Sequence, residues 1–206
     1  MGRSSSFESR RWISHPLTRE LFSTAAMVIT LLAARSSLAD HYQVPTGSME
    51  PTVMPGDRVI VNKAAYGLRL PGTDSYLVDT GDPQPGDVVV LTSPETGITL
   101  LKRIVAVPGD RVQVADGHVL RNGAKLVNPS AETETLGATS HALRLEDGGG
   151  PDFGPQTLPP HKFLVMGDNR GNSHDGRMFG LVERDAIMGR AVKIVARDGH
   201  LTWQSL

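Results

Sequence analysis

A serine in a tight loop is the first residue of this sequence that could do chemistry. Ser48 lies in the segment 45–52, which reads Pro-Thr-Gly-Ser-Met-Glu-Pro-Thr. Glycine and proline interrupt helices and strands, so we predict an exposed loop here. A hydroxyl held on such a loop can act as a nucleophile if a base removes its proton. Taken alone, a serine in this setting is more often only a turn residue.

A lysine in an apolar strand could supply that base. Lys102 lies in the segment 100–107, LLKRIVAV, where alternate side chains share one face of a strand. The residues on its face, all apolar, are Leu100, Ile104 and Ala106. Burial disfavours the charged ammonium and lowers the pKa of the amine, and a neutral amine can accept a proton. The alternative is a lysine at a sheet edge whose amine reaches water.

A third segment, 167–177, brings many polar groups together after an apolar strand. It contains two carboxylates and two guanidinium groups, on Asp168, Asp175, Arg170 and Arg177. Such groups can form ion pairs that hold a loop in shape. A metal site built from Asp168, Asn169 and Asp175 is the alternative, but its spacing does not match an EF-hand loop. We expect no metal ion and no other cofactor.

The neighbours His174 and Asp175 also suggest a Ser/His/Asp triad with Ser48. The G-x-S-x-G motif that often carries the serine of such a triad is absent. Adjacent residues of an extended segment point to opposite faces, so Asp175 is poorly placed to orient His174. We therefore prefer the lysine as the base.

The elements that must position these residues are short strands. Segments rich in β-branched residues, separated by Gly, Pro and Asp, occur at 58–62, 87–91, 98–107, 111–114, 162–167 and 187–196. Asn122-Gly123 is a strong hairpin signal. Because no long helical period follows residue 40, we predict a mainly β body. Residues 128–160 are polar and rich in Gly and Pro, and we predict a long loop there.

The N-terminal region has a different character. Residues 21–34 are uncharged, and the run extends to residue 39 with only Arg35 inside it. A bilayer crossing needs roughly 20 apolar residues. Four arginines upstream, Arg3, Arg10, Arg11 and Arg19, favour a cytoplasmic N-terminus. We predict a cytoplasmic tail over 1–20, one transmembrane helix over 21–39 and an extracytoplasmic domain over 40–206. A cleaved secretory signal and a soluble amphipathic helix are the alternatives.

The composition excludes several classes of protein. The 206 residues include no cysteine, which rules out disulfides, a thiolate nucleophile and a cysteine zinc site. With 21 basic and 22 acidic residues the net charge is −1, and we expect no nucleic-acid partner. The 22 glycines and 14 prolines indicate many turns, and hence many short strands.

Together these segments resemble bacterial type I signal peptidases, serine proteases with a Ser/Lys dyad. The matching blocks are PTGSMEPT (45–52), GDRVIVNKAAYGLRLP (56–71), GDVVVLTSPETGITLLKRIVAVPGD (86–110) and GDNRGNSHDGRMFGLV (167–182). Residues 111–160 are weakly covered. The sequence departs from the common pattern at Gly176, where serine is frequent, and at Ala106, where glycine is frequent.

The resemblance implies a role for each matching residue. Ser48 would be the nucleophile and Lys102 the general base. The backbone N–H of Ser48 and the hydroxyl of Thr46 would form the oxyanion hole. Ser173 would hydrogen-bond to the lysine amine and orient it, and Met49 would lie beside the substrate cleft. The residues that brace the loop would be Asp168, Asp175 and Arg177.

The resemblance also implies a fold and a function. The fold would be an antiparallel β-sheet catalytic core with a small inserted β region, here within 111–160. The function would be that of a membrane-bound serine endopeptidase that removes N-terminal signal peptides from secreted preproteins by acyl transfer. Its partners would be preproteins and the lipid bilayer.

Three other functions compete with this one. A dedicated processing peptidase of the same family, for example for pilus proteins, would carry the same motifs. A self-cleaving repressor would need a DNA-binding helix pair, and residues 1–40 offer an apolar run instead. A non-catalytic, membrane-tethered β module that binds partners would leave Ser48 and Lys102 chemically ordinary.

Overall fold

The computed structural model describes residues 20–25, 27, 39–69, 76–128 and 132–206. The chain divides into two compact units, Met1–Arg35 and Ser36–Leu206. In the first unit, residues 20–25 are helical. The predicted tail over 1–20 and the predicted anchor over 21–39 fall mostly outside the described residues. Within the described part of the chain, no helix combines the length and the apolar character that a bilayer crossing requires.

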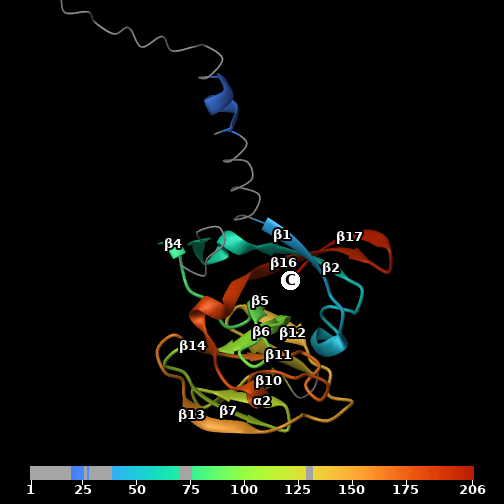
Figure 1. Cartoon of the computed structure of the whole chain (residues 1–206). Helices are drawn as coiled ribbons and strands as arrows, with labels where there is room; N and C mark the ends of the chain where they lie inside the picture. The colour runs from blue at the N-terminus through green and yellow to red at the C-terminus, as the bar shows by residue number, and fades with distance from the viewer. Residues whose placement is uncertain (1–19, 26, 28–38, 70–75, 129–131) are drawn as a thin grey trace, which may run out of the picture. The chain divides into compact units, whose positions relative to one another are not determined.

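The second unit is mainly β and antiparallel, as predicted (Figure 1). Its largest sheet has eight strands, seven of them in the order β1-β2-β16-β5-β6-β14-β15, with β17 paired to β16. These strands are β1 (Ala39–Gln43), β2 (Arg58–Asn62), β5 (Val88–Thr92), β6 (Thr99–Ala106), β14 (Lys162–Met166), β15 (Val182–Glu183), β16 (Ile187–Arg197) and β17 (His200–Ser205). The late strand β16 therefore lies in the sheet between two early strands.

Three smaller sheets and four short helices complete the described part of this unit. The sheets are β13-β7-β8-β9, β10-β11-β12 and β3-β4. Their strands are β3 (Gly67–Arg69), β4 (Tyr76–Asp79), β7 (Arg111–Ala115), β8 (His118–Arg121), β9 (Ala124–Lys125), β10 (Val127–Asn128), β11 (Thr133–Leu136), β12 (Thr139–Ala142) and β13 (Phe153–Thr157). The helices are η1 (Gly47–Met49), η2 (Lys63–Ala65), α2 (Gly176–Phe179) and η3 (Arg184–Ala186). In Figure 1, β7 and β13 lie at the opposite end of the unit from β1 and β2.

The hairpin predicted at Asn122-Gly123 is present. These two residues join β8 to β9, and Arg121 pairs with Ala124 across the turn. Asn122 has a φ of 53° and Gly123 a φ of 83°. Positive φ at both central residues is what a two-residue turn needs to match the twist of its strands.

The long loop predicted over 128–160 is wrong, because the segment contains β11, β12 and β13. In β11 the side chains alternate: Glu134 and Leu136 are buried, whereas Thr135 is exposed. One of the two inward-facing positions of β11 therefore carries a charged residue. For this reason the alternation of apolar and polar residues that marks a strand is not apparent in the sequence. Glu134 can be buried because Arg170 pairs with it.

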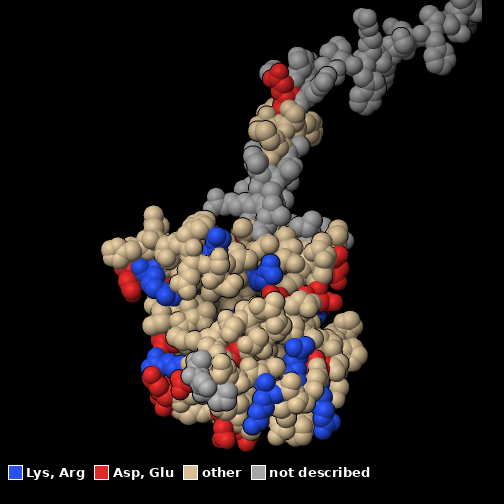
Figure 2. Space-filling model, turned by 180° about the vertical axis from the view of Figure 1, so that it is seen from behind, with Lys and Arg blue, Asp and Glu red and all other residues tan. Residues whose placement is uncertain are grey.

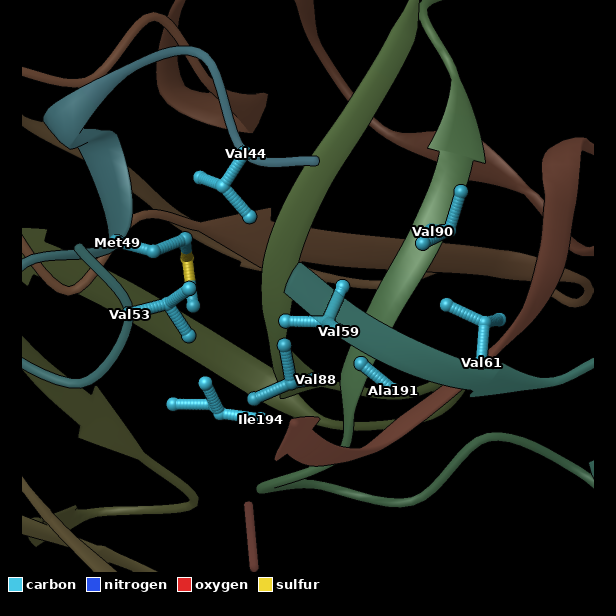
Figure 3. Close-up of a cluster of buried hydrophobic side chains, with 9 residues drawn as sticks. All are labelled: Val44, Met49, Val53, Val59, Val61, Val88, Val90, Ala191 and Ile194. Carbon is cyan, nitrogen blue, oxygen red and sulfur yellow. The ribbon is translucent and has the colours of Figure 1, made fainter. Parts of the chain in front are cut away.

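One apolar cluster ties the Ser48 segment to the main sheet (Figure 3). It contains Val44, Met49 and Val53 from the segment around Ser48. The other members come from β2, β5 and β16, and they are Val59, Val61, Val88, Val90, Ala191 and Ile194. Burial of these side chains holds the segment against the sheet, since each valine, isoleucine or methionine contributes roughly 1.5–3 kcal/mol.

The surface mixes charges of both signs. Figure 2 shows Lys and Arg side chains interspersed with Asp and Glu on one face. Exposed large apolar side chains in the described part of the second unit are spread over several elements, with two of them on β17: Val78, Ile98, Met178, Leu201 and Trp203. On the β16–β17 hairpin, Lys193 Nζ lies 5.0 Å from the centre of the Trp203 ring, a cation–π contact.

Candidate active site

Ser48 lies in the short helix η1, which is anchored on both sides. Before it, the Val44 N–H donates to the Asp57 carbonyl at 2.9 Å. After it, the Val53 N–H donates to the Met49 carbonyl at 2.9 Å. Because Met49 and Val53 are also buried in the apolar cluster, the turn that carries Ser48 has little freedom to move.

Met49, which the resemblance places beside the substrate cleft, packs into the apolar cluster. Its side chain is only 1% exposed. Figure 3 shows it beside Val53 and directed into the cluster. In η1 the side chains of successive residues diverge, so a half-exposed Ser48 is followed by a buried Met49. The buried Met49 side chain thus anchors the loop to the apolar cluster.

Lys102 meets Ser48 across 54 residues of sequence. Its Nζ lies 2.6 Å from Ser48 Oγ, a hydrogen-bonding distance. The lysine is 3% exposed, in the middle of β6, between β5 and β14. Burial lowers the pKa of Lys102 to about 8, helped by the nearby charge of Arg177 and opposed by Asp175 and Asp168. A substantial fraction of this amine is therefore neutral near pH 8, and neutral lysine accepts protons.

Asp168 is held by a buried ion pair beneath the site. Arg103, next to Lys102 in β6, donates from Nε and Nη2 to the two carboxylate oxygens at 2.8 and 2.7 Å. Thr52 Oγ1 donates to Asp168 Oδ2 at 2.5 Å. Burial alone would raise the pKa of Asp168, but the charge and hydrogen bonds of Arg103 hold it below its usual value. This pair connects the lysine strand to the segment 167–177.

Asp175 and Arg177 form a second buried ion pair. Arg177 Nε and Nη2 donate to the Asp175 carboxylate, each at 2.8 Å. Asp175 also accepts from the Gly167 N–H at 3.0 Å, and it caps α2 by accepting from the Arg177 N–H at 3.2 Å. Although burial raises it, the pKa of Asp175 is held below its usual value, chiefly by Arg177. These contacts all lie within the segment 167–177 and therefore hold its two ends together.

Ser173 is buried beside the site, but it does not form the predicted hydrogen bond to Lys102. Within the part of the chain that the structure describes, its hydroxyl has no hydrogen-bond partner. A Cβ added at Gly167 would lie 2.3 Å from both Ser173 Oγ and the Ser48 carbonyl oxygen. Only glycine allows this close approach. Ser173 thus packs against Gly167 while the lysine amine bonds to Ser48.

Thr46 immediately precedes η1 in extended backbone, with φ −131° and ψ 156°. It is exposed, and its side chain makes no capping hydrogen bond to η1. Between Thr46 and Ser48 stands only Gly47. Thr46 therefore lies at the surface next to the nucleophile loop, where a substrate could reach it.

His174 and Asp175 do not form a triad. His174 Nε2 lies 2.7 Å from Glu95 Oε2, and both side chains are exposed. The Asp175 carboxylate is occupied by Arg177. Among the described residues, no three His, Asp or Glu side chains gather closely enough to hold a metal ion.

The structure adds partners for the polar segment that the motifs did not indicate. Arg170, in the polar segment, pairs with Glu134 of β11 at 2.5 Å, and both side chains are fully buried. His141 of β12 lies 3.5 Å from Glu134 and 3.6 Å from Asp168. Asn169 donates from its backbone N–H to the Ser48 carbonyl at 3.2 Å. Only the strand-like alternation around Glu134 could have indicated these contacts.

Comparison with known proteins finds consistent relatives. The family model for "Signal peptidase, peptidase S26" matches residues 17–196. Signal peptidase I of Pseudomonas aeruginosa is 36% identical over 195 residues, covering 82% of this chain and 68% of that protein. Signal peptidase I T of Bacillus subtilis is 35% identical over 168 residues, covering 80% and 79%. A solved signal peptidase I from Enterococcus faecalis is 28% identical and covers 54% of this chain and 98% of its own, with a TM-score of 0.41.

Proposed function

Since this chain belongs to the signal peptidase family, peptidase S26, we propose that Ser48 and Lys102 are the groups with which it cuts its substrates. The protein is a serine endopeptidase that removes signal peptides from secreted proteins. The observation that best supports the proposed pair is the 2.6 Å contact between Lys102 Nζ and Ser48 Oγ. Burial supplies the second requirement, since it lowers the pKa of Lys102 to about 8.

In the proposed first step, neutral Lys102 takes the proton of Ser48 as Oγ attacks the carbonyl carbon of the scissile peptide bond. The resulting tetrahedral oxyanion would be stabilised by the Ser48 N–H and the Thr46 hydroxyl. As the carbon–nitrogen bond breaks, the Lys102 ammonium gives its proton to the departing amine. This leaves the signal peptide bound to Ser48 as an ester.

In the proposed second step, Lys102, neutral again, takes a proton from a water molecule that attacks the ester. The carbon–oxygen bond to Ser48 breaks, and the proton returns to Oγ. Asp168, Asp175 and Arg177 would act indirectly. The Asp168–Arg103 ion pair joins the segment 167–177 to the strand that carries Lys102, and the Asp175–Arg177 ion pair holds the segment itself in shape.

A shallow apolar pocket beside this pair is a suitable place for the signal peptide. It lies between residues 42–45, just before η1, and residues 99–101 at the start of β6. Val44 and Pro45 line it from one side, and Leu100 and Leu101 from the other. A shallow pocket of this kind would favour small side chains before the cut, which is the preference that the family resemblance implies.

We further propose the membrane arrangement expected from the sequence: a cytoplasmic tail over 1–20, an anchor over 21–39 and an extracytoplasmic domain over 40–206, with a small β insertion within 111–160. Ser48 lies only eight positions after Asp40. An extended chain of that length reaches at most ~29 Å. Such an anchor would keep the nucleophile near the bilayer, where the cleavage site of a membrane-bound preprotein also lies.

The proposal can be tested with a model preprotein in detergent or lipid. The wild type, Ser48→Ala and Lys102→Ala would be compared, with Ser140→Ala and Lys125→Ala as matched controls at exposed positions. We expect the first two variants to lose cleavage and the controls to keep it. Equal cleavage by all five proteins would refute the assignment. Protease protection of residues 1–20 in sealed vesicles would test the membrane arrangement.

A further inference from the structure

An arginine from the middle of the chain reaches the loop that carries Ser48. Arg144, in the segment after β12, forms an ion pair through Nη1 with Glu50, two residues after Ser48. The Arg144 side chain is 36% exposed and that of Glu50 only 14%. Arg144 also pairs with Glu146 through Nη2 at 2.8 Å. The better buried member of the first pair is therefore the acid on the nucleophile loop.

The backbone reinforces this contact. The Arg144 N–H donates to the Asp168 carbonyl at 3.0 Å. Asn169, the next residue, donates from its N–H to the Ser48 carbonyl and from its side-chain amide to the Gly47 carbonyl, both at 3.2 Å. Hydrogen bonds thus connect Arg144 to the segment 168–169, and that segment to the nucleophile loop. The Arg144–Glu50 ion pair completes this circle of contacts by joining the loop back to Arg144.

The carboxylate of Glu50 lies against Gly47, the residue between the two proposed oxyanion donors. A Cβ added to Gly47 would lie 2.7 Å from Glu50 Oε1. Gly47 stands between Thr46 and Ser48, whose hydroxyl and N–H we assign to the oxyanion hole. A partly buried negative charge at this place would oppose the negative charge that develops on the substrate oxygen.

We propose that Arg144 is a positioning residue for peptide cleavage, which neutralises Glu50 and holds its carboxylate in place beside the oxyanion hole. This inference rests on the proposed roles of Ser48 and Thr46. Arg144 touches neither the nucleophile nor the base, so it acts through Glu50 and through the loop. It gives residues 111–160, which the family motifs cover weakly, an indirect part in catalysis.

The test is a double-mutant cycle that measures kcat and KM on a model preprotein in detergent. Arg144→Gln leaves Glu50 without its partner, and we expect kcat to fall about tenfold while KM changes less than twofold. Arg144→Lys keeps the positive charge and should lose no more than about threefold. In the double variant Glu50→Gln/Arg144→Gln the unpaired charge is gone, so kcat should return to within about threefold of Glu50→Gln alone.

Two comparisons separate this effect from loss of structure. Arg190 pairs with Asp87 at 3.4 Å, with side chains 46% and 13% exposed, so Arg190→Gln removes a similarly placed pair that does not involve the nucleophile loop. It should leave kcat within twofold of the wild type. In addition, the defect of Arg144→Gln should shrink in about 1 M salt, relative to the wild type, because salt screens a partly exposed charge.

The inference is overturned if Arg144→Gln keeps the wild-type kcat, or if the double variant is as slow as Arg144→Gln. It is also overturned if only KM changes. Ser48→Ala, measured in the same series, tests the proposed function independently. A dead Ser48→Ala with a fully active Arg144→Gln would refute the role of Arg144 alone, whereas an active Ser48→Ala would refute both.

Discussion

Replacing Lys102 by methionine should abolish cleavage and yet stabilise the protein at pH 7. The lysine is 3% exposed, and burial lowers its pKa from the ordinary 10.5 to about 8. One pKa unit corresponds to 1.36 kcal/mol, so keeping this amine charged in the folded protein costs about 3 kcal/mol. Methionine has a similar shape and no charge, so it removes that cost.

Part of the gain is offset and part depends on pH. Losing the hydrogen bond from Lys102 to Ser48 costs roughly 1 kcal/mol, which leaves a net gain of roughly 2 kcal/mol in the free energy of unfolding. Between about pH 8 and pH 10.5 the folded wild type has released the lysine proton while the unfolded chain still binds it. Wild-type stability therefore rises with pH in this window, and the advantage of the variant should vanish by about pH 10.

Urea unfolding followed by circular dichroism at pH 7 and pH 10 would measure both effects. The control is Lys125→Met, at an exposed position on β9, which should show no such pH-dependent difference from the wild type. If Lys102→Met is no more stable than the wild type at pH 7, burial of the charged lysine does not destabilise the folded protein. A gain of the same size at pH 7 and pH 10 would also refute the reasoning, because it would not come from charge.

Three further predictions concern cleavage and the buried ion pairs. The value of kcat/KM should rise about tenfold per pH unit below pH 8 and level off above it, since only neutral Lys102 can take the proton; a flat profile between pH 6 and pH 9 would contradict this. In initial-rate assays, Thr46→Val should lower kcat about 100-fold because an oxyanion donor is lost, whereas Thr46→Ser should keep the wild-type kcat. If Thr46→Val is as fast as the wild type, Thr46 has no part in the mechanism. Asp168→Asn should reduce the free energy of unfolding by about 3–5 kcal/mol in denaturant titrations, because Arg103 stays buried without a counter-charge; a loss below about 1 kcal/mol would show that the pair is not needed.

Local patterns predicted the parts of the fold in which local forces decide. The β-branched run 58–62 is β2, and Asn122-Gly123 forms the turn after β8. The apolar neighbours of Lys102 made a buried lysine one of two possibilities, because a strand has only two faces, but they did not exclude a lysine at a sheet edge. The contact with Ser48 followed from the resemblance rather than from any pattern, since 54 residues separate the two.

The parts that could not be predicted depend on partners distant in sequence. Arg103, Arg170 and Glu134 are at most 2% exposed, although arginine and glutamate are among the residues least often buried. Only the tertiary structure shows that each of them forms an ion pair with a residue distant in sequence. The packing of Met49 into the apolar cluster could not be predicted either, because the direction of a side chain in a short turn cannot be read from its neighbours.

The position of β16 has a consequence for when the enzyme becomes active. This strand comes late in the chain, yet it pairs with β2 on one side and β5 on the other. Ala191 and Ile194, both on β16, belong to the apolar cluster that holds Met49. Before residues 187–197 have docked, the nucleophile loop lacks part of the apolar surface against which Met49 packs. We therefore expect the nucleophile loop to gain its full support only after β16 has docked between β2 and β5.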